Sequence, residues 1–122
     1  MTRLIIGGDC NCTLTKKDKK GGLAWKPTNF RNCILITMNM LDLVEIQRER
    51  HPKVNKFSYS SKALNLKSRI DFFLLAKELK KCVSKVDIQT SIAPDHSLIY
   101  LSLNLPEEAP RGLAFGHLIT PY

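Results

Sequence analysis

Three short segments of the chain place acidic, amide or imidazole side chains at the ends of expected strands. The first is Gly7–Asn11, which reads Gly-Gly-Asp-Cys-Asn and puts Asp9 and Asn11 after a glycine turn. Side chains at such turns project into clefts, where an Asp can activate water and an Asn can hold a phosphate oxygen. The alternative is that Asp9 and Asn11 cap the turn by hydrogen bonding to its backbone.

The second segment puts a carboxylate, Asp71, inside the apolar run Ile70–Leu75. A charged group in such a run is costly unless a partner compensates it. The partner is either Arg69, which lies two residues away on the same strand face, or a histidine whose tautomer and orientation Asp71 fixes.

The third segment, Pro94–Ser97, reads Pro-Asp-His-Ser and comes just before the most regular strand pattern in the chain. Asp95 and His96 offer a carboxylate for a metal or a phosphate site beside a group that carries a proton near neutral pH. The alternative is a turn built on Pro94 and Asp95, in which His96 has no role.

The sequence patterns between and around these segments predict an α/β chain with about five strands and one or two helices. These elements must position the three segments. A polar, lysine-containing loop is expected at Asp9–Gly22, and residues 106–122 are expected to form an irregular tail. Helices are expected at Asn29–Leu43, with Thr28 or Asn29 as N-cap, and through Val44–Arg50. Strands are expected at Arg3–Gly8, Lys56–Ser61, Arg69–Leu75, Val86–Ile92 and His96–Leu105.

Composition narrows the class of protein. The 122 residues carry a net charge of +8, which favours polyanionic partners such as nucleic acid. There is no signal-peptide pattern and no apolar run long enough to span a bilayer, so no membrane partner is expected. The four cysteines lack the spacing of a metal site, which predicts reduced and mostly buried thiols in an intracellular protein.

Taken in order, the motifs Gly-Gly-Asp-x-Asn, Ser-Arg-Ile-Asp-Phe-Phe-Leu and Asp-His-Ser-Leu resemble those of the endonuclease/exonuclease/phosphatase superfamily. The segments Asp42–Pro52 and Lys56–Ser61 are similar to the LINE-type (non-LTR) retrotransposon branch. The resemblance runs over residues 1–105 and covers the C-terminal half of that family's domain. It implies half of a four-layer α/β/β/α sandwich, with one mixed sheet and one or two helices.

The resemblance also implies roles for single residues. Asp9 would polarise the attacking water, and Asn11 would hold the scissile phosphate. Asp71 would orient His96, which would contact the phosphate as base or as stabiliser of developing charge. Asp95 would lie at or near a Mg²⁺ ion, and the reaction would be hydrolysis of a phosphodiester.

Three further residues are implied to contact DNA: Ser58 and Ser60 on a DNA-facing strand, and Arg69 at the phosphate backbone. The Lys16–Lys20 loop is a further expected backbone contact. Some positions depart from the family pattern, since Pro94 replaces a usual Ser, and Gln47 and Tyr59 stand where Trp is common.

The family's essential metal-binding Glu belongs to the N-terminal half, and no motif of this chain matches it. The glutamates within the matched segment are Glu45, Glu49 and Glu78, and none lies in a family motif. We therefore expect a retrotransposon-derived, Mg-dependent DNA-nicking endonuclease fragment that is inactive alone. An uncovered sheet face would favour self-association or binding of a missing N-terminal half.

Two other interpretations remain open. The chain could be a basic nucleic-acid-binding remnant without catalysis, whose DNA affinity would depend on salt and ignore Asp9→Ala. It could also be an open-reading-frame remnant with no selected role. Action on DNA fits a nuclear location, although the lysine clusters are short and interrupted.

Overall fold

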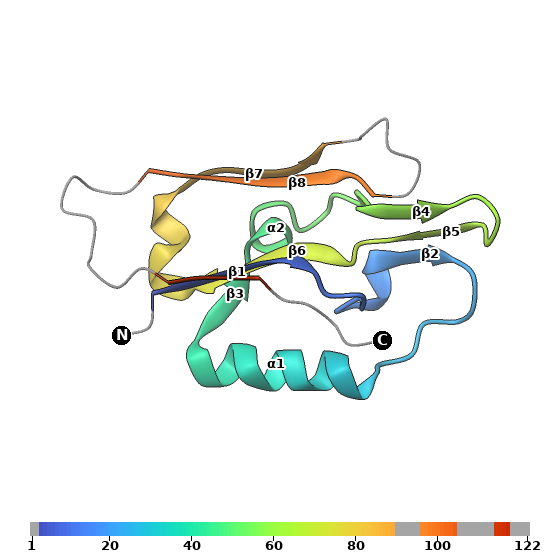
Figure 1. Ribbon diagram of the computed structural model, residues 1–122, viewed down its shortest axis with the longest axis horizontal. Helices are drawn as coiled ribbons and strands as arrows, with labels where there is room; N and C mark the ends of the chain where they lie inside the picture. Colours follow the sequence, from blue (N-terminus) through green and yellow to red (C-terminus); the bar gives the residue numbers. More distant parts are fainter. Residues whose placement is uncertain (1–2, 90–95, 105–113, 118–122) are drawn as a thin grey trace.

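The computed structural model describes residues 3–89, residues 96–104 and, for the backbone alone, residues 114–117. It is a small α/β domain, which confirms the expected fold class (Figure 1). In chain order the elements are β1 (Leu4–Asp9), η1 (Lys16–Asp18), β2 (Lys19–Gly21), α1 (Asn29–Leu41), β3 (Leu43–Glu45), α2 (Ile46–Arg50), β4 (Tyr59–Ser61), β5 (Leu66–Ser68), β6 (Asp71–Ala76), η2 (Lys77–Cys82), β7 (Val83–Gln89), β8 (Leu98–Leu103) and β9 (Ala114–His117), where η marks a 3-10 helix.

The described strands form three hydrogen-bonded sheets. The largest is mixed and has the order β3-β6-β1-β9, with β6 antiparallel to β1 and β9 parallel to it. The strands β2, β5 and β4 form a second, antiparallel sheet, and β7 pairs with β8. The expected mixed sheet is therefore present, and two smaller sheets accompany it.

The mixed sheet lies between helical layers. Helix α1 runs along one side of this sheet, while α2 and the β7–β8 pair lie on the other (Figure 1). Strand β6 lies between β3 and β1, and five of its six residues are buried, so the continuous apolar run does mark a central strand. The core joins Ile34 of α1, Leu75 of β6 and Val86 of β7 in one cluster.

Helix α1 begins where the sequence predicts. The Thr28 side chain accepts a hydrogen bond from the Arg31 backbone N–H at 3.1 Å, which caps the first turn. The helix ends at Asp42, whose φ of 54° is left-handed and breaks the helical hydrogen-bond pattern. Its outer face leaves Ile36 and Met40 exposed.

Among the short strands, β4 lies within the expected strand Lys56–Ser61, but β2, β3, β5 and β9 were not expected. The segment Asp9–Gly22 contains η1 and β2 instead of an uninterrupted loop, and the tail 106–122 contributes β9 to the main sheet, so the expectation that it is irregular was wrong. A strand of three or four residues takes its hydrogen bonds from a partner distant in sequence. It therefore needs no periodic pattern of its own.

Close packing fixes the register between β1 and β6. Gly7 lies opposite Phe73, and a Cβ added at Gly7 would come within 2.5 Å of the Phe73 ring. Only glycine allows the ring to lie across the strand at this point. Two residues further along, the same register places Asp9 opposite Asp71.

Candidate functional site

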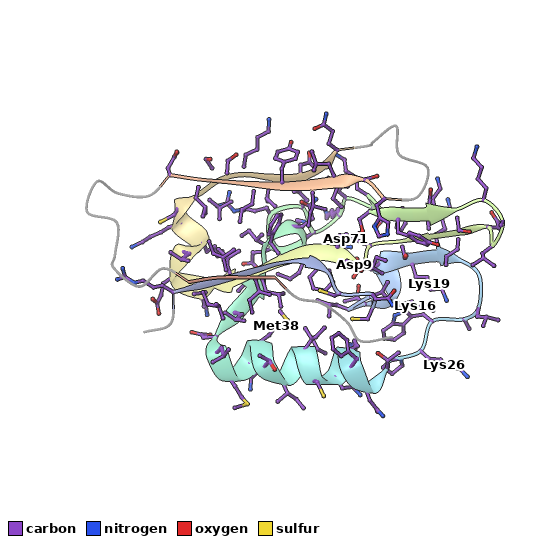
Figure 2. All side chains as sticks on the ribbon, viewed as in Figure 1. Asp9, Lys16, Lys19, Lys26, Met38 and Asp71 are labelled. Carbon is purple, nitrogen blue, oxygen red and sulfur yellow. The ribbon has the colours of Figure 1, made fainter. Side chains whose placement is uncertain are left out.

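Asp9 and Asp71 meet at one end of the mixed sheet. Asp9 is the last residue of β1 and Asp71 is the first residue of the antiparallel strand β6, so the two are cross-strand partners. Figure 2 shows both side chains at this end of the sheet, near β2, β4 and β5. Two carboxylates placed directly opposite each other repel, and a cation between them would relieve the repulsion.

His96 joins the pair from the segment that leads into β8. Its Nδ1 atom lies 3.0 Å from Oδ2 of Asp71, and one atom from each of Asp9, Asp71 and His96 lies within 4.8 Å of the others. The structure thus pairs Asp71 with the histidine and not with Arg69. Because an ionised carboxylate only accepts hydrogen bonds, Asp71 selects the tautomer in which Nδ1 carries the proton.

Strand β4 holds His96 in this position. Tyr59 forms an isolated β-bridge with His96, and the two ring centroids are 5.2 Å apart. The neighbouring Ser97 N–H donates to the Ser58 carbonyl at 2.7 Å. His96 is therefore held through its backbone, its ring face and its Nδ1 atom.

Ser58 is a support of the site and does not face solvent. Its exposed fraction is 0%, so the expectation that it contacts DNA was wrong. The Ser58 Oγ accepts hydrogen bonds from the backbone N–H groups of Ile70 and Asp71, both at 3.0 Å. These bonds fix the backbone at the start of β6, where the Asp71 side chain emerges. Ser60, by contrast, is half-buried and lines two surface pockets, so its expected contact with DNA stays a prediction.

Arg69 is also buried, with 2% of its surface exposed, so the expectation that it contacts DNA was wrong as well. Its Nε donates to Oδ1 of Asp18 at 2.9 Å, and its Nη2 donates to Glu45. Arg48 makes a second ion pair with Asp18. A guanidinium enclosed by two carboxylates compensates their charge inside the fold and cannot reach a ligand outside it.

This ion network keeps Asp18 ionised. Burial tends to raise the pKa of Asp18, but the charge of Arg69 and hydrogen bonds from Arg69, Arg48 and Thr15 outweigh burial. The pKa of Asp18 therefore lies below its ordinary value. Because η1, α2 and the start of β6 all contribute to the network, it fixes the frame in which Asp71 lies.

The pKa of the Asp71 carboxyl group is shifted in the opposite direction from that of Asp18. Burial raises the pKa of Asp71 above its ordinary value, and the nearby Asp9 charge adds to the effect. Hydrogen bonds from Ser58 and His96 offset part of the increase. A group whose charged form is disfavoured in this way gains from a cation or a protonated imidazole beside it.

The first motif supports both interpretations of Asp9. The Asn11 backbone N–H donates to Oδ1 of Asp9 at 2.8 Å, and Asn11 is exposed with a left-handed φ of 48°. Asp9 therefore does cap its turn, as the alternative proposed. It also contributes to the three-residue cluster, because a carboxylate has more than one acceptor site. The phosphate contact of Asn11 stays a prediction.

Asp95, the residue expected at the metal, lies outside the described residues, as do Pro94 and the tail beyond His117. Among the residues that are described, Asp9, Asp71 and His96 are the group that could hold a metal ion. Two carboxylates and an imidazole suit a divalent cation, and the carboxylates are the ligands that Mg²⁺ prefers.

The cysteines are not part of the Asp9–Asp71–His96 cluster, although Cys10 directly follows Asp9. All four are free thiols; Cys10 and Cys12 are buried and Cys33 is exposed. Burial raises the pKa of Cys12 to about 11 and raises that of Cys10 as well. Both buried thiols stay protonated at neutral pH and are poor nucleophiles.

Sequence reasoning missed Asp18 and Glu45 as supporting residues and gave Ser58 a different role, that of a DNA contact. Ser58, Asp18 and Glu45 hold the site together, although each reads as an ordinary surface residue. The one available signal was the run Arg69–Asp71, in which two charges next to apolar residues demand buried partners. It could not say which residues those partners were.

A search against models of known protein families finds none that matches this chain. Among the described residues, no helix is both long enough and apolar enough to cross a membrane.

Proposed function

We propose that the chain carries part of a metal-dependent phosphodiester-hydrolysing site of the endonuclease/exonuclease/phosphatase type, similar to that of LINE-type retrotransposon endonucleases. The observation that carries the proposal is the convergence of three motifs distant in sequence. Asp9, Asp71 and His96 meet within 4.8 Å, and Asp71 bonds His96 as the resemblance implies. The substrate is DNA, and the expected cation is Mg²⁺.

The residues of the chain have separate tasks in this proposal. Asp71 holds the His96 ring in one plane and one tautomer, so that the imidazole contacts the scissile phosphate as base or as stabiliser of developing charge. Asp9 orients the attacking water. A bound Mg²⁺ would be held by Asp9 and Asp71 and would offset negative charge on the phosphate oxygens.

The site needs a further carboxylate, and no glutamate that the structure describes supplies it. Glu45 bonds Arg69 in the buried network, and Glu49 pairs with Lys80. Glu78 lies in η2, which follows the end of β6 opposite to Asp71. None of the three therefore reaches the cluster, which supports a site completed by a second chain or segment.

The test is nicking of supercoiled plasmid by the purified chain in Mg²⁺, with EDTA and His96→Ala as controls. We expect no nicking, because no described residue supplies the cation with an additional carboxylate. Nicking that disappears in both controls would show that the chain completes its own site, and the proposed incompleteness would be wrong. Nicking that persists in EDTA or in His96→Ala would come from a contaminating nuclease.

A second candidate function, DNA binding without hydrolysis, is favoured by one specific observation. The three-stranded sheet beside the cluster presents lysines on two surface pockets. This function predicts that Asp9→Ala leaves DNA affinity unchanged, because the lysines and not the carboxylate carry the binding.

A further inference from the structure

Two lysines face each other without compensation on the sheet β2-β5-β4. The register places Lys20 of β2 directly opposite Lys67 of β5, and Lys67 in turn lies opposite Ser60 of β4. Like charges that are directly opposite across strands destabilise a sheet. Both lysines are exposed, and neither forms an ion pair with any residue that the structure describes. An arrangement that is unfavourable in the free protein becomes favourable when an anion lies between the charges.

The surface around these lysines is hollowed. Lys20, Lys62 and Lys67 line a pocket of about 590 Å³ together with the Ser60 and Ser61 hydroxyl groups. Three ammonium groups with hydroxyl donors are the chemistry that binds phosphate oxygens. The described residues that line this pocket include no acidic side chain.

A second pocket extends this surface toward the chain segment that carries His96. Its volume is about 450 Å³, and it shares Ser60 and Lys67 with the first pocket. Its wall also includes Tyr59, whose ring contacts His96, and Ser97, which follows His96 in the chain. One phosphate could fill one pocket, whereas two adjoining pockets beside the cluster suit a ligand with phosphates at regular intervals.

We propose that the β2-β5-β4 sheet, through Lys20, Lys62 and Lys67, is the surface on which this chain holds the phosphate backbone of a nucleic-acid strand next to the Asp9–Asp71–His96 cluster. The choice of ligand rests on the proposed function. The contact is to phosphates and carries no base specificity. It replaces the expected contacts through Arg69 and Ser58, which are buried.

The experiment compares two double variants by fluorescence anisotropy of a labelled DNA duplex, in EDTA and over a range of salt concentrations. Lys20→Gln/Lys67→Gln removes the opposed pair. Lys77→Gln/Lys81→Gln removes the same charge from η2, which lies at the far end of the molecule from this sheet (Figure 1). We expect the first variant to bind about tenfold more weakly at low salt and to lower the slope of log affinity against log salt by about 2. The control should change both quantities far less.

Thermal unfolding of both variants keeps the comparison interpretable. Because Lys20→Gln/Lys67→Gln removes a repulsion, its unfolding temperature should equal or exceed that of the wild type. Equal weakening in the two variants would overturn the proposal, since net charge alone would explain binding. A polyglutamate of the same charge that competes as well as DNA would also overturn it. Because EDTA removes divalent cations, binding measured in EDTA tests the lysine contacts alone. A result against the proposed cation site would therefore leave this binding result unchanged.

Discussion

Asp71 is the residue on which the site depends. It is almost fully buried, and it lies opposite a second carboxylate while bonding an imidazole. Burial pushes the Asp71 pKa upward, while Ser58 and His96 push it down and leave a net increase. Because the pKa of Asp71 is raised in the folded state, the protonated form of Asp71 favours folding. This contribution to stability is fully present below the ordinary pKa of 3.8. That contribution is lost as the pH rises through the folded-state pKa.

The first prediction concerns this titration directly. The side-chain carboxyl carbon of Asp71, followed by NMR against pH, should titrate with a midpoint above 3.8. In His96→Ala the midpoint should move further up, because a hydrogen bond that favours the charged form is lost. Asp87 is the internal control, since its bond from Lys56 lowers its pKa. An Asp71 midpoint below that of Asp87 would contradict the account.

How much of the site could be predicted differs from residue to residue. That Asp71 needs a partner follows from its apolar neighbours alone. That the partner is His96 and not Arg69 does not follow, because it depends on where β4 places His96. The buried, supporting role of Ser58 could not be predicted, since a serine in an alternating strand pattern is ordinarily on the solvent-facing side.

At the scale of elements, a buried network of ion pairs joins three segments that are far apart in the sequence. We call this network of Asp18, Glu45 and Arg69 the clamp. Asp18 ends η1, Glu45 caps α2, and Arg69 precedes β6, and the three charges meet in the interior. Removing one member of such a network leaves its partner charged and unpaired, which costs more than the pair itself contributes. The clamp therefore fixes η1, α2 and the segment before β6 relative to one another, and so fixes the frame in which Asp71 lies.

The second prediction is that Asp18→Asn lowers the free energy of unfolding at neutral pH by about 3–5 kcal/mol. The pKa of Asp18 is depressed, so its contribution is present above 3.8 and is lost as the pH falls through the folded-state value. Urea unfolding should show the difference from wild type shrinking as the medium becomes acidic. Asp42→Asn, at an exposed left-handed position that Asn tolerates, is the matched control. A pH-independent loss would show that the ion pairs are not its cause.

The elements that could be predicted are those with a periodic signal. Helix α1 packs Ile34 into the core, β6 is buried on both faces, and β8 packs the partly buried Leu101 and Leu103 against the core, so each leaves a pattern in the sequence. The strands β2 and β9 lack such a pattern, because pairing with segments distant in sequence makes them strands, and β5 forms by pairing with both β2 and the nearby β4. Missing β2 and β5 also hid the opposition of Lys20 and Lys67.

At the scale of the whole molecule, some positively charged side chains are buried in ion pairs and others line surface pockets. The net charge of +8 predicts polyanion binding, but the sequence alone could not say where. The fold buries Arg69 and leaves Lys20, Lys62 and Lys67 on the pockets beside the cluster. The mixed sheet therefore positions Asp9 and Asp71, while the small sheet next to it holds His96 through β4 and presents the lysines.

The central claim is that Asp9 and Asp71 hold a divalent cation beside His96. The measurement that tests it most directly is paramagnetic broadening of NMR signals by Mn²⁺ in wild type, Asp9→Asn and the control Asp42→Asn. The account predicts that low Mn²⁺ broadens the signals of the three cluster residues first, that excess Mg²⁺ reverses the broadening, and that Asp9→Asn alone abolishes it. Broadening spread evenly over exposed carboxylates such as Glu49, or unchanged in Asp9→Asn, would contradict the claim.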